Sequence, residues 1–124
     1  MKKSIISTVA AAAGLGALVA CDTPAFAAGE SIPYTFCSDT REVSTLNWFD
    51  ADNDQVSRSN LVLSRREAGR WCGTVSLTSR STYQLTGSAI QTEGTYAYCG
   101  IAINGTIADS DYSTGRYAVA VCSA

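Results

Sequence analysis

Histidine is absent from this 124-residue sequence, and its only lysines are Lys2 and Lys3 at the N-terminus. Without histidine, a Ser-His-Asp or Cys-His centre has no general base, and a zinc site built on imidazole cannot form. The CxxC, GxGxxG and phosphate-loop motifs, which mark common redox and nucleotide sites, are absent as well. These absences predict a protein that is not an enzyme and that binds no cofactor or metal.

One run of acidic residues resembles part of a calcium-binding site. Asp50, Asp52 and Asp54 stand at alternate positions, like the opening of a calcium loop. However, Gln55 occupies the position where an EF-hand requires glycine, and Leu61 the position of its bidentate glutamate. We therefore interpret the run as a polar turn between two strands. A hydrolase that uses a pair of carboxylates ranks well below the other hypotheses, because so small a sandwich is a poor host for a deep cleft.

The N-terminal segment is typical of an export signal. After the two lysines, residues 4–20 are uncharged and mostly small or apolar, and this stretch is short for a membrane-spanning helix. Cleavage after Ala27, in an Ala-x-Ala context, predicts a signal peptide over 1–27 and a single domain over 28–124. The alternative is a lipobox that ends at Cys21, which would make this cysteine the lipidated first residue of an anchored lipoprotein. Either route predicts a secreted or cell-envelope protein.

The net charge of the expected domain limits the classes of partner that it can attract. Residues 28–124 contain seven arginines against ten acidic residues, a net charge of −3, and no lysine. Such a chain has little electrostatic attraction for nucleic acid or for an anionic membrane. We therefore expect no nucleic-acid partner, and membrane attachment only through a lipid on Cys21.

Four cysteines remain in the exported domain, which predicts two disulfides in an oxidising compartment. Four cysteines allow three pairings. We favour Cys37 with Cys72 and Cys99 with Cys122, because local closure within a sheet is the simpler arrangement. Each bond would add about 3–4 kcal/mol in the chain-entropy model.

Alternating apolar and polar residues, with no helical stretch, predict an all-β domain. Asn104-Gly105 is a strong hairpin signal, because a type I′ turn needs positive φ at both central residues. Seven or eight short antiparallel strands in about 100 residues favour an immunoglobulin-like β-sandwich. We expect strands over residues 32–37, 43–49, 56–64, 71–78, 83–90, 95–103, 106–108 and 116–122, with a charged connection over 65–70.

Two adjacent aromatic residues stand out. Trp48 and Phe49 cannot both face inward on one regular strand, since successive side chains point to opposite faces. Either one of them is exposed or the strand bulges. The exposed member would be a candidate contact for an apolar ligand or a partner, although cover by a neighbouring loop is an equally good interpretation.

The C-terminal segment resembles a known family, the small mycobacterial membrane proteins called MmpS. The resemblance rests on Cys99-x-Ile101-x-Ile103-Asn104-Gly105-x-Ile107-x-Asp109, on Ser113-Thr114-Gly115 and on Cys122. A weaker match is Val43-x-x-Leu46-Asn47-Trp48-Phe49-Asp50-x-Asp52. The resemblance implies an extracytoplasmic β-sandwich that assists a membrane transporter in exporting lipids or siderophores.

The sequence departs from this family in three ways. Its N-terminal segment looks cleavable, whereas the family usually keeps a membrane helix. The family's Leu-Pro-Trp motif is not visible, and Cys37 and Cys72 form an added pair. The main hypothesis is a non-catalytic exported accessory module. The alternative is a secreted inhibitor or ligand-binding protein that acts on an extracellular hydrolase or takes an apolar ligand.

Overall fold

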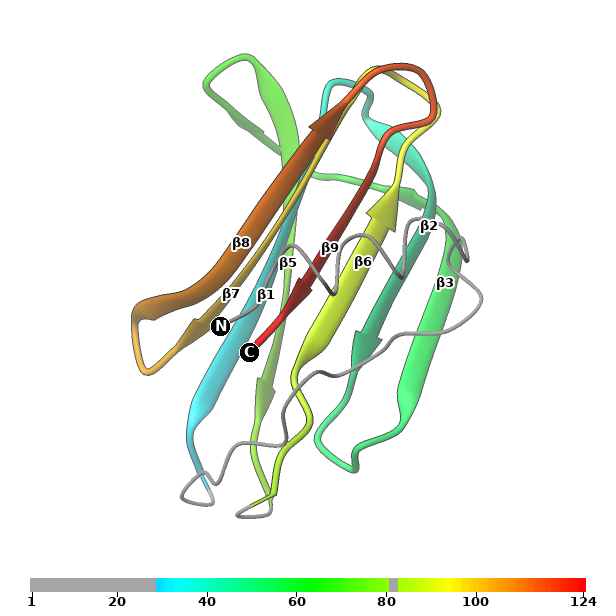
Figure 1. The fold of residues 1–124 in the computed structure, drawn as a ribbon. Helices are drawn as coiled ribbons and strands as arrows, with labels where there is room; N and C mark the ends of the chain where they lie inside the picture. The colour runs from blue at the N-terminus through cyan, green and yellow to red at the C-terminus, as the bar shows by residue number, and fades with distance from the viewer. Residues whose placement is uncertain (1–28, 81–82) are drawn as a thin grey trace.

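The computed structural model describes residues 29–80 and 83–124, which form nine strands and no helix (Figure 1). They make a five-stranded sheet, in the order β4-β5-β1-β7-β8, packed on a four-stranded sheet, in the order β3-β2-β6-β9. Every strand pair is antiparallel. The bounds are β1 Ser31–Ser38, β2 Glu42–Phe49, β3 Gln55–Val62, β4 Arg65–Glu67, β5 Arg70–Thr78, β6 Gly87–Gln91, β7 Tyr96–Ile103, β8 Thr106–Thr114 and β9 Val119–Ser123.

The core lies between the two sheets and follows from the alternation along each strand. In β1, for example, Ile32, Tyr34 and Phe36 are buried, while the residues between them are only half-buried. The buried cluster consists of Ile32, Tyr34, Phe36, Val43, Leu46, Leu63, Ile90, Ala97, Cys99, Ile101, Ala118, Ala120 and Cys122. The prediction of an all-β sandwich of two antiparallel sheets is confirmed.

Both predicted disulfides are present, but their roles differ. Cys37 and Cys72 are direct neighbours across β1 and β5, with Cα atoms 4.1 Å apart, so this bond lies within one sheet. The bond between Cys99 and Cys122 joins β7 to β9, with Cα atoms 6.2 Å apart, and so crosses the core between the sheets. The pairing is confirmed, whereas the assumption that both bonds close within a sheet was wrong for the second. Two disulfides indicate an oxidising, extracytoplasmic environment.

Two carboxylates close the side of the sandwich where β8 of one sheet meets β9 of the other. Asp109 accepts the backbone N–H of Ser123 at 3.0 Å, and Asp111 accepts that of Val121 at 3.1 Å. β9 is an edge strand, and its outward N–H groups would otherwise lack strand partners. The acidic residues of β8 therefore join the two sheets.

The strands differ from the expected ones at four places. The connection over 65–70 is a hairpin of β4 and β5, because Ala68 and Gly69 both adopt positive φ and allow a two-residue turn. The predicted strand over 83–90 begins only at Gly87, that over 106–108 continues to Thr114, and that over 116–122 begins at Val119. The prediction for β8 was too short because residues 109–114 are mostly polar, although their backbone still pairs with β7.

The expected cleavage after Ala27 and the lipidation at Cys21 lie outside the described residues. Within 29–80 and 83–124, no helix is long and apolar enough to cross a membrane.

Candidate functional site

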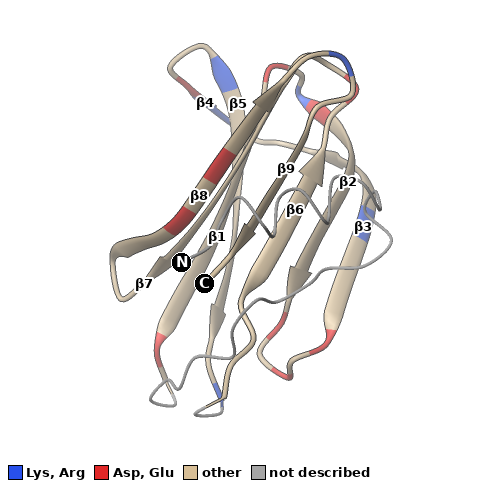
Figure 2. Ribbon diagram, viewed as in Figure 1, with Lys and Arg blue, Asp and Glu red and all other residues tan. Residues whose placement is uncertain are grey.

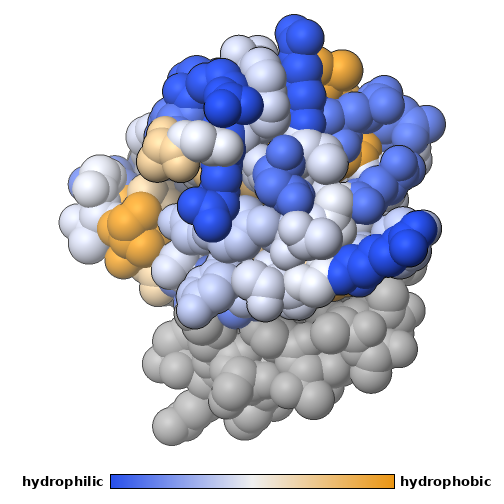
Figure 3. Space-filling model, turned by 90° about the horizontal axis from the view of Figure 1, so that it is seen from above, coloured by the Kyte–Doolittle hydropathy of each residue, from blue (hydrophilic) through white to orange (hydrophobic). Residues whose placement is uncertain are grey.

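The two ends of the sandwich carry different charged residues: both signs occur at the end with the β4–β5 hairpin, whereas acidic residues predominate at the opposite end (Figure 2). We call the end that carries the β4–β5 hairpin the arginine–aromatic end. Its defining side chains are Arg41, Arg66, Arg70, Arg116, Trp71, Tyr96, Tyr112 and Tyr117. The opposite, acidic end carries Glu30, Asp50, Asp52 and Asp54 with Arg80. Figure 3 looks onto the arginine–aromatic end, where strongly hydrophilic side chains project among paler ones.

Trp71 lies next to two guanidinium groups. Arg41, from the turn between β1 and β2, lies 5.1 Å from the ring centroid, and Arg66, on β4, lies 5.0 Å from it. The indole itself packs against the edge of the core. Both guanidiniums are within the range of a cation–π interaction, so one ring holds two cations at the surface.

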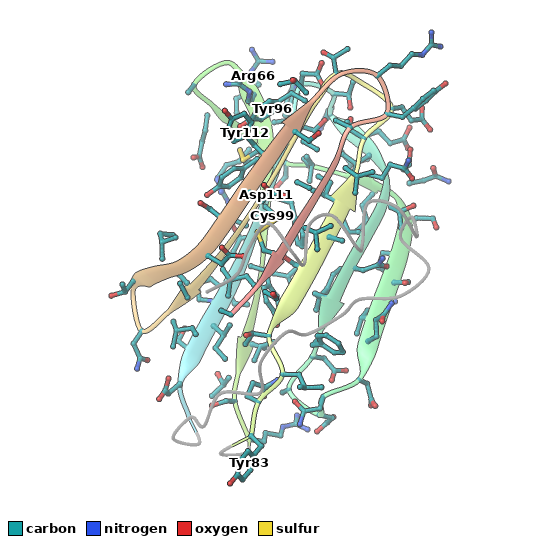
Figure 4. All side chains as sticks on the ribbon, in the orientation of Figure 1. Arg66, Tyr83, Tyr96, Cys99, Asp111 and Tyr112 are labelled. Carbon is teal, nitrogen blue, oxygen red and sulfur yellow. A yellow bond between two sulfur atoms is a disulfide. The ribbon has the colours of Figure 1, made fainter. Side chains whose placement is uncertain are left out.

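A second stack crosses the outer face of the five-stranded sheet. The guanidinium of Arg70 lies 3.8 Å from the ring centroid of Tyr96, and Tyr96 stacks on Tyr112 with centroids 6.1 Å apart. Figure 4 shows the two tyrosines side by side near the hairpin. Tyr112 is 66% exposed. The column thus runs from a cation on β5, across β7, to a tyrosine on β8 that is open to solvent.

The loop between β8 and β9 adds a further pair at the same end. Arg116 lies 5.1 Å from the ring centroid of Tyr117, which is exposed. Tyr117 has φ 58°, an uncommon conformation for an aromatic residue. Its backbone N–H donates to the carbonyl of Gly94, and that of Gly115 donates to Thr95. These bonds fasten the loop to the connection between β6 and β7.

Asp39 fastens the β1–β2 turn to the same connection. Its carboxylate accepts the backbone N–H groups of Thr95 and Tyr96 at 3.0 and 3.1 Å, and the Thr95 hydroxyl at 2.7 Å. Burial would raise the pKa of this carboxyl, but the hydrogen bonds from Thr95 and Tyr96 outweigh it and lower the pKa. Asp39 is therefore a charged anchor that holds two loops together.

Three hydroxyls reinforce this junction. The Thr92 hydroxyl lies 2.7 Å from that of Ser38 and 3.0 Å from that of Thr40. Thr40 in turn donates to the carbonyl of Glu42. Since Ser38 and Thr92 are fully buried, these bonds are shielded from water. The loops at the arginine–aromatic end are consequently held in one arrangement.

The guanidinium groups of Arg41, Arg66 and Arg70 contact aromatic rings, but they keep N–H groups that can donate hydrogen bonds to a partner. No ion pair between Arg41, Arg66 or Arg70 and another described residue accompanies the stacking. A guanidinium stacked by its face still presents N–H groups along its edge. Trp, Tyr and Arg are also the residues that most often dominate binding energy in protein interfaces. The arrangement can bind an acidic, partly apolar protein surface.

A concave region lies between the sheets near the acidic end. It has a volume of about 470 Å³, and Trp48, Val75 and Leu77 supply its apolar part. Asp50, Asp52 and Arg80 lie around it. We call this region the intersheet cleft.

The structure places the predicted contact residues on opposite faces of β2. Trp48 is half-buried and faces the core, with its ring 6.3 Å from that of Phe36. Phe49 is only 8% exposed and lies against Gly87 of β6. Neither ring is therefore the largely exposed contact that the sequence suggested. Trp48 lines the intersheet cleft, and its role as a ligand contact stays a prediction.

The acidic run forms the turn between β2 and β3. One Asp50 oxygen accepts the backbone N–H groups of Asp52 and Asp54 at 2.9 and 3.0 Å. Across the described residues, no group of three or more His, Cys, Asp or Glu side chains is placed to hold a metal ion. Asn104 and Gly105 make the turn between β7 and β8 with φ 51° and 81°, and the backbone N–H of Asn104 donates to the carbonyl of Ser31 at the start of β1.

Sequence reasoning missed the arginine–aromatic end. It treated residues 65–70 as a connection and most of the aromatic residues as core. One signal was available: Arg65-Arg66 and Arg70 flank a turn that leads directly into Trp71. No local sequence signal predicts the contact between Arg41 and Trp71. Arg41 lies in the turn between β1 and β2, whereas Trp71 lies on β5, far along the chain.

No protein-family model matches the sequence, and no curated protein matches it either.

Proposed function

We propose that the chain is an exported, non-catalytic binding module that assists a membrane transporter, as the resemblance to the MmpS proteins implies, in the export of lipids or siderophores. The observation that carries this proposal is the stacking of Arg41 and Arg66 on Trp71, and of Arg70 on Tyr96, at one end of the fold. The partner surface would be acidic with apolar patches.

Rigidity supports a binding role for this end. Binding is weakened by the entropy lost when loops and long side chains become ordered. Here Asp39 and the hydroxyls of Ser38 and Thr92 already fix the loops. The aromatic rings likewise hold the guanidiniums in place. Little further ordering is needed when a partner docks.

Location is part of the proposal. We propose that the module acts outside the cytoplasm, either diffusible from residue 28 onward or tethered through lipidated Cys21. The intact mass of the native protein, taken separately from culture fluid and from membranes, distinguishes these forms. A membrane species that starts at Cys21 with added acyl mass would supply the anchor that the accessory role needs. A soluble species alone would argue against a fixed position beside a transporter.

The accessory role is tested by chemical crosslinking in intact cells, followed by identification of the captured protein. We expect a polytopic transporter to be captured by the native protein and by Arg58→Ala, which removes an exposed arginine on β3 away from this end. The double variant with Arg66→Ala and Arg70→Ala should capture at least about tenfold less, since two interface arginines together contribute about 2 kcal/mol or more. Capture of monomer alone would contradict the accessory role.

The same experiment addresses the inhibitor hypothesis. Capture of a soluble hydrolase by the native protein, with the same dependence on Arg66 and Arg70, would replace the transporter role with inhibition. The captured enzyme would then lose activity when the module is added at micromolar concentration.

A further inference from the structure

The intersheet cleft exists because one side of the five-stranded sheet is only partly covered. β4 pairs with Arg70–Cys72, and no described strand pairs with the β4 side of β5 beyond that point. There β5 faces β2 of the other sheet, with Val75 and Leu77 on one wall and Trp48 on the other. Among residues 29–80 and 83–124, no further strand closes this side of the sandwich near the acidic end.

The cleft has an apolar interior. Trp48, Val75 and Leu77 are each half-buried and pack against the core cluster. Their remaining exposed surface is apolar and faces a space of about 470 Å³. Ligand sites typically combine such a volume with apolar walls and a few polar groups.

The polar residues that line the cleft are Asp50, Asp52, Arg80, Ser76, Thr78 and Ser79, so two carboxylates face one guanidinium and the charged groups sum to −1. Asp50 and Asp52 line it, and Asp54 and Glu30 belong to the same end of the molecule. Arg80 is the cation of this end and pairs with Asp52 at 2.6 Å. The acidic end thus keeps an excess of negative charge, which attracts cations and repels anions.

We propose that the intersheet cleft binds a small cationic amphiphile. An apolar chain or ring would lie against Trp48, Val75 and Leu77, and an ammonium group would remain near the carboxylates of Asp50 and Asp52. This site lies at the opposite end from the arginine–aromatic surface. It goes beyond the proposed accessory function and does not depend on it.

Trp48 provides a direct reporter. In the exported protein with Trp71→Phe, Trp48 is the one remaining tryptophan. Decyltrimethylammonium, below its critical micelle concentration, should produce a saturable change in Trp48 emission. Decyl sulfate, with the same chain and the opposite charge, should bind at least about tenfold more weakly, because the carboxylates repel it. Tetramethylammonium, which lacks the chain, should give no saturable change.

Two variants locate the site. Val75→Phe fills the cleft and should abolish the saturable change. Asp52→Asn, on an exposed turn, should weaken decyltrimethylammonium binding about fivefold, as expected for one charge near an ammonium group at the surface. Glu93→Gln, an exposed carboxylate at the other end, should leave binding unchanged. Equal affinity for both detergents, or binding that survives in both cleft variants, would overturn the proposal. If Val75→Phe does not fold, Asp52→Asn alone decides.

Discussion

The two ends of this sandwich share one core and the same strands, yet they differ in how their surfaces are built. At the arginine–aromatic end, three connections meet, those between β1 and β2, β6 and β7, and β8 and β9, and Asp39, Thr92 and Thr95 join them. At the acidic end, Asp50 closes the turn between β2 and β3, and the Asn53 side chain joins this turn to Tyr83 and Leu85 ahead of β6. One small fold thus offers an arginine–aromatic surface, which we propose binds a macromolecule, and at its opposite end a cleft, which we propose binds a small ligand.

The largest loss of stability should come from removing the Cys99–Cys122 disulfide, which joins the two sheets through the core. Replacing Cys99 and Cys122 together by alanine should lower the free energy of unfolding by about 4 kcal/mol or more. The cross-link is lost and a cavity forms between the sheets. The matched pair, Cys37→Ala with Cys72→Ala, should cost about 3 kcal/mol, because it breaks a bond within one sheet. Urea unfolding measures both. A larger loss for the second pair would contradict this ranking.

Gly94→Ala should disturb the arginine–aromatic end selectively. A Cβ atom at this position would lie 2.3 Å from an Asp39 carboxylate oxygen and 2.7 Å from a Thr40 methyl carbon. The loops must then separate, at a cost of about 2 kcal/mol. Hydrogen exchange should rise in the connection between β6 and β7. Exchange in the turn at Asp50 should not change, and a rise there instead would show that the ends are not independent.

The Asp39 anchor makes this end sensitive to acid. Its hydrogen bonds lower the carboxyl pKa in the folded protein, so its stabilisation is present above the ordinary pKa of aspartate. The stabilisation disappears as pH falls through the lower, folded value. Asp39→Asn should therefore cost about 1–2 kcal/mol at neutral pH, and this cost should shrink as the pH falls through the lowered pKa of Asp39. Urea unfolding from pH 7 to pH 2 checks this; a difference that persists at pH 2 would contradict it.

The smallest effects should lie at the acidic end. Asp50→Ala removes the acceptor of two backbone N–H groups and should cost about 1 kcal/mol. Asp52→Ala removes an exposed pair with Arg80 and should cost less than about 0.5 kcal/mol. Thermal unfolding of the two variants gives the ranking. The reverse order would mean that the Arg80 pair, and not the turn, organises this end.

Most of the strands, one hairpin and the number of disulfides were predictable, because the sequence signals for them are local. Alternation located most strands, Asn104-Gly105 located a hairpin, and the cysteine count implied two disulfides. The surfaces were not predictable, because they depend on contacts distant in sequence. Asp39 and Thr95 are 56 residues apart. Nothing in the sequence near Asp109 indicates that its carboxylate accepts the N–H of Ser123.

Trp48 illustrates the limit of pattern reasoning. Alternation correctly placed Trp48 and Phe49 on opposite faces of β2. It could not reveal that β4 leaves part of β5 uncovered, and thus that a cleft lies beside Trp48. The hairpin of β4 and β5 was itself missed, because its Ala68-Gly69 turn lacks the usual Asn-Gly signal.

The central claim is that the arginine–aromatic end carries the macromolecular interface. Two tyrosines of nearly equal exposure test it: Tyr112 at this end is 66% exposed, and Tyr83 near the other end is 63% exposed (Figure 4). Each is replaced in turn by a photocrosslinking phenylalanine derivative in intact cells. We predict covalent capture of a transporter from position 112 and none from position 83. Capture from position 83 alone, or from neither position, would contradict the account.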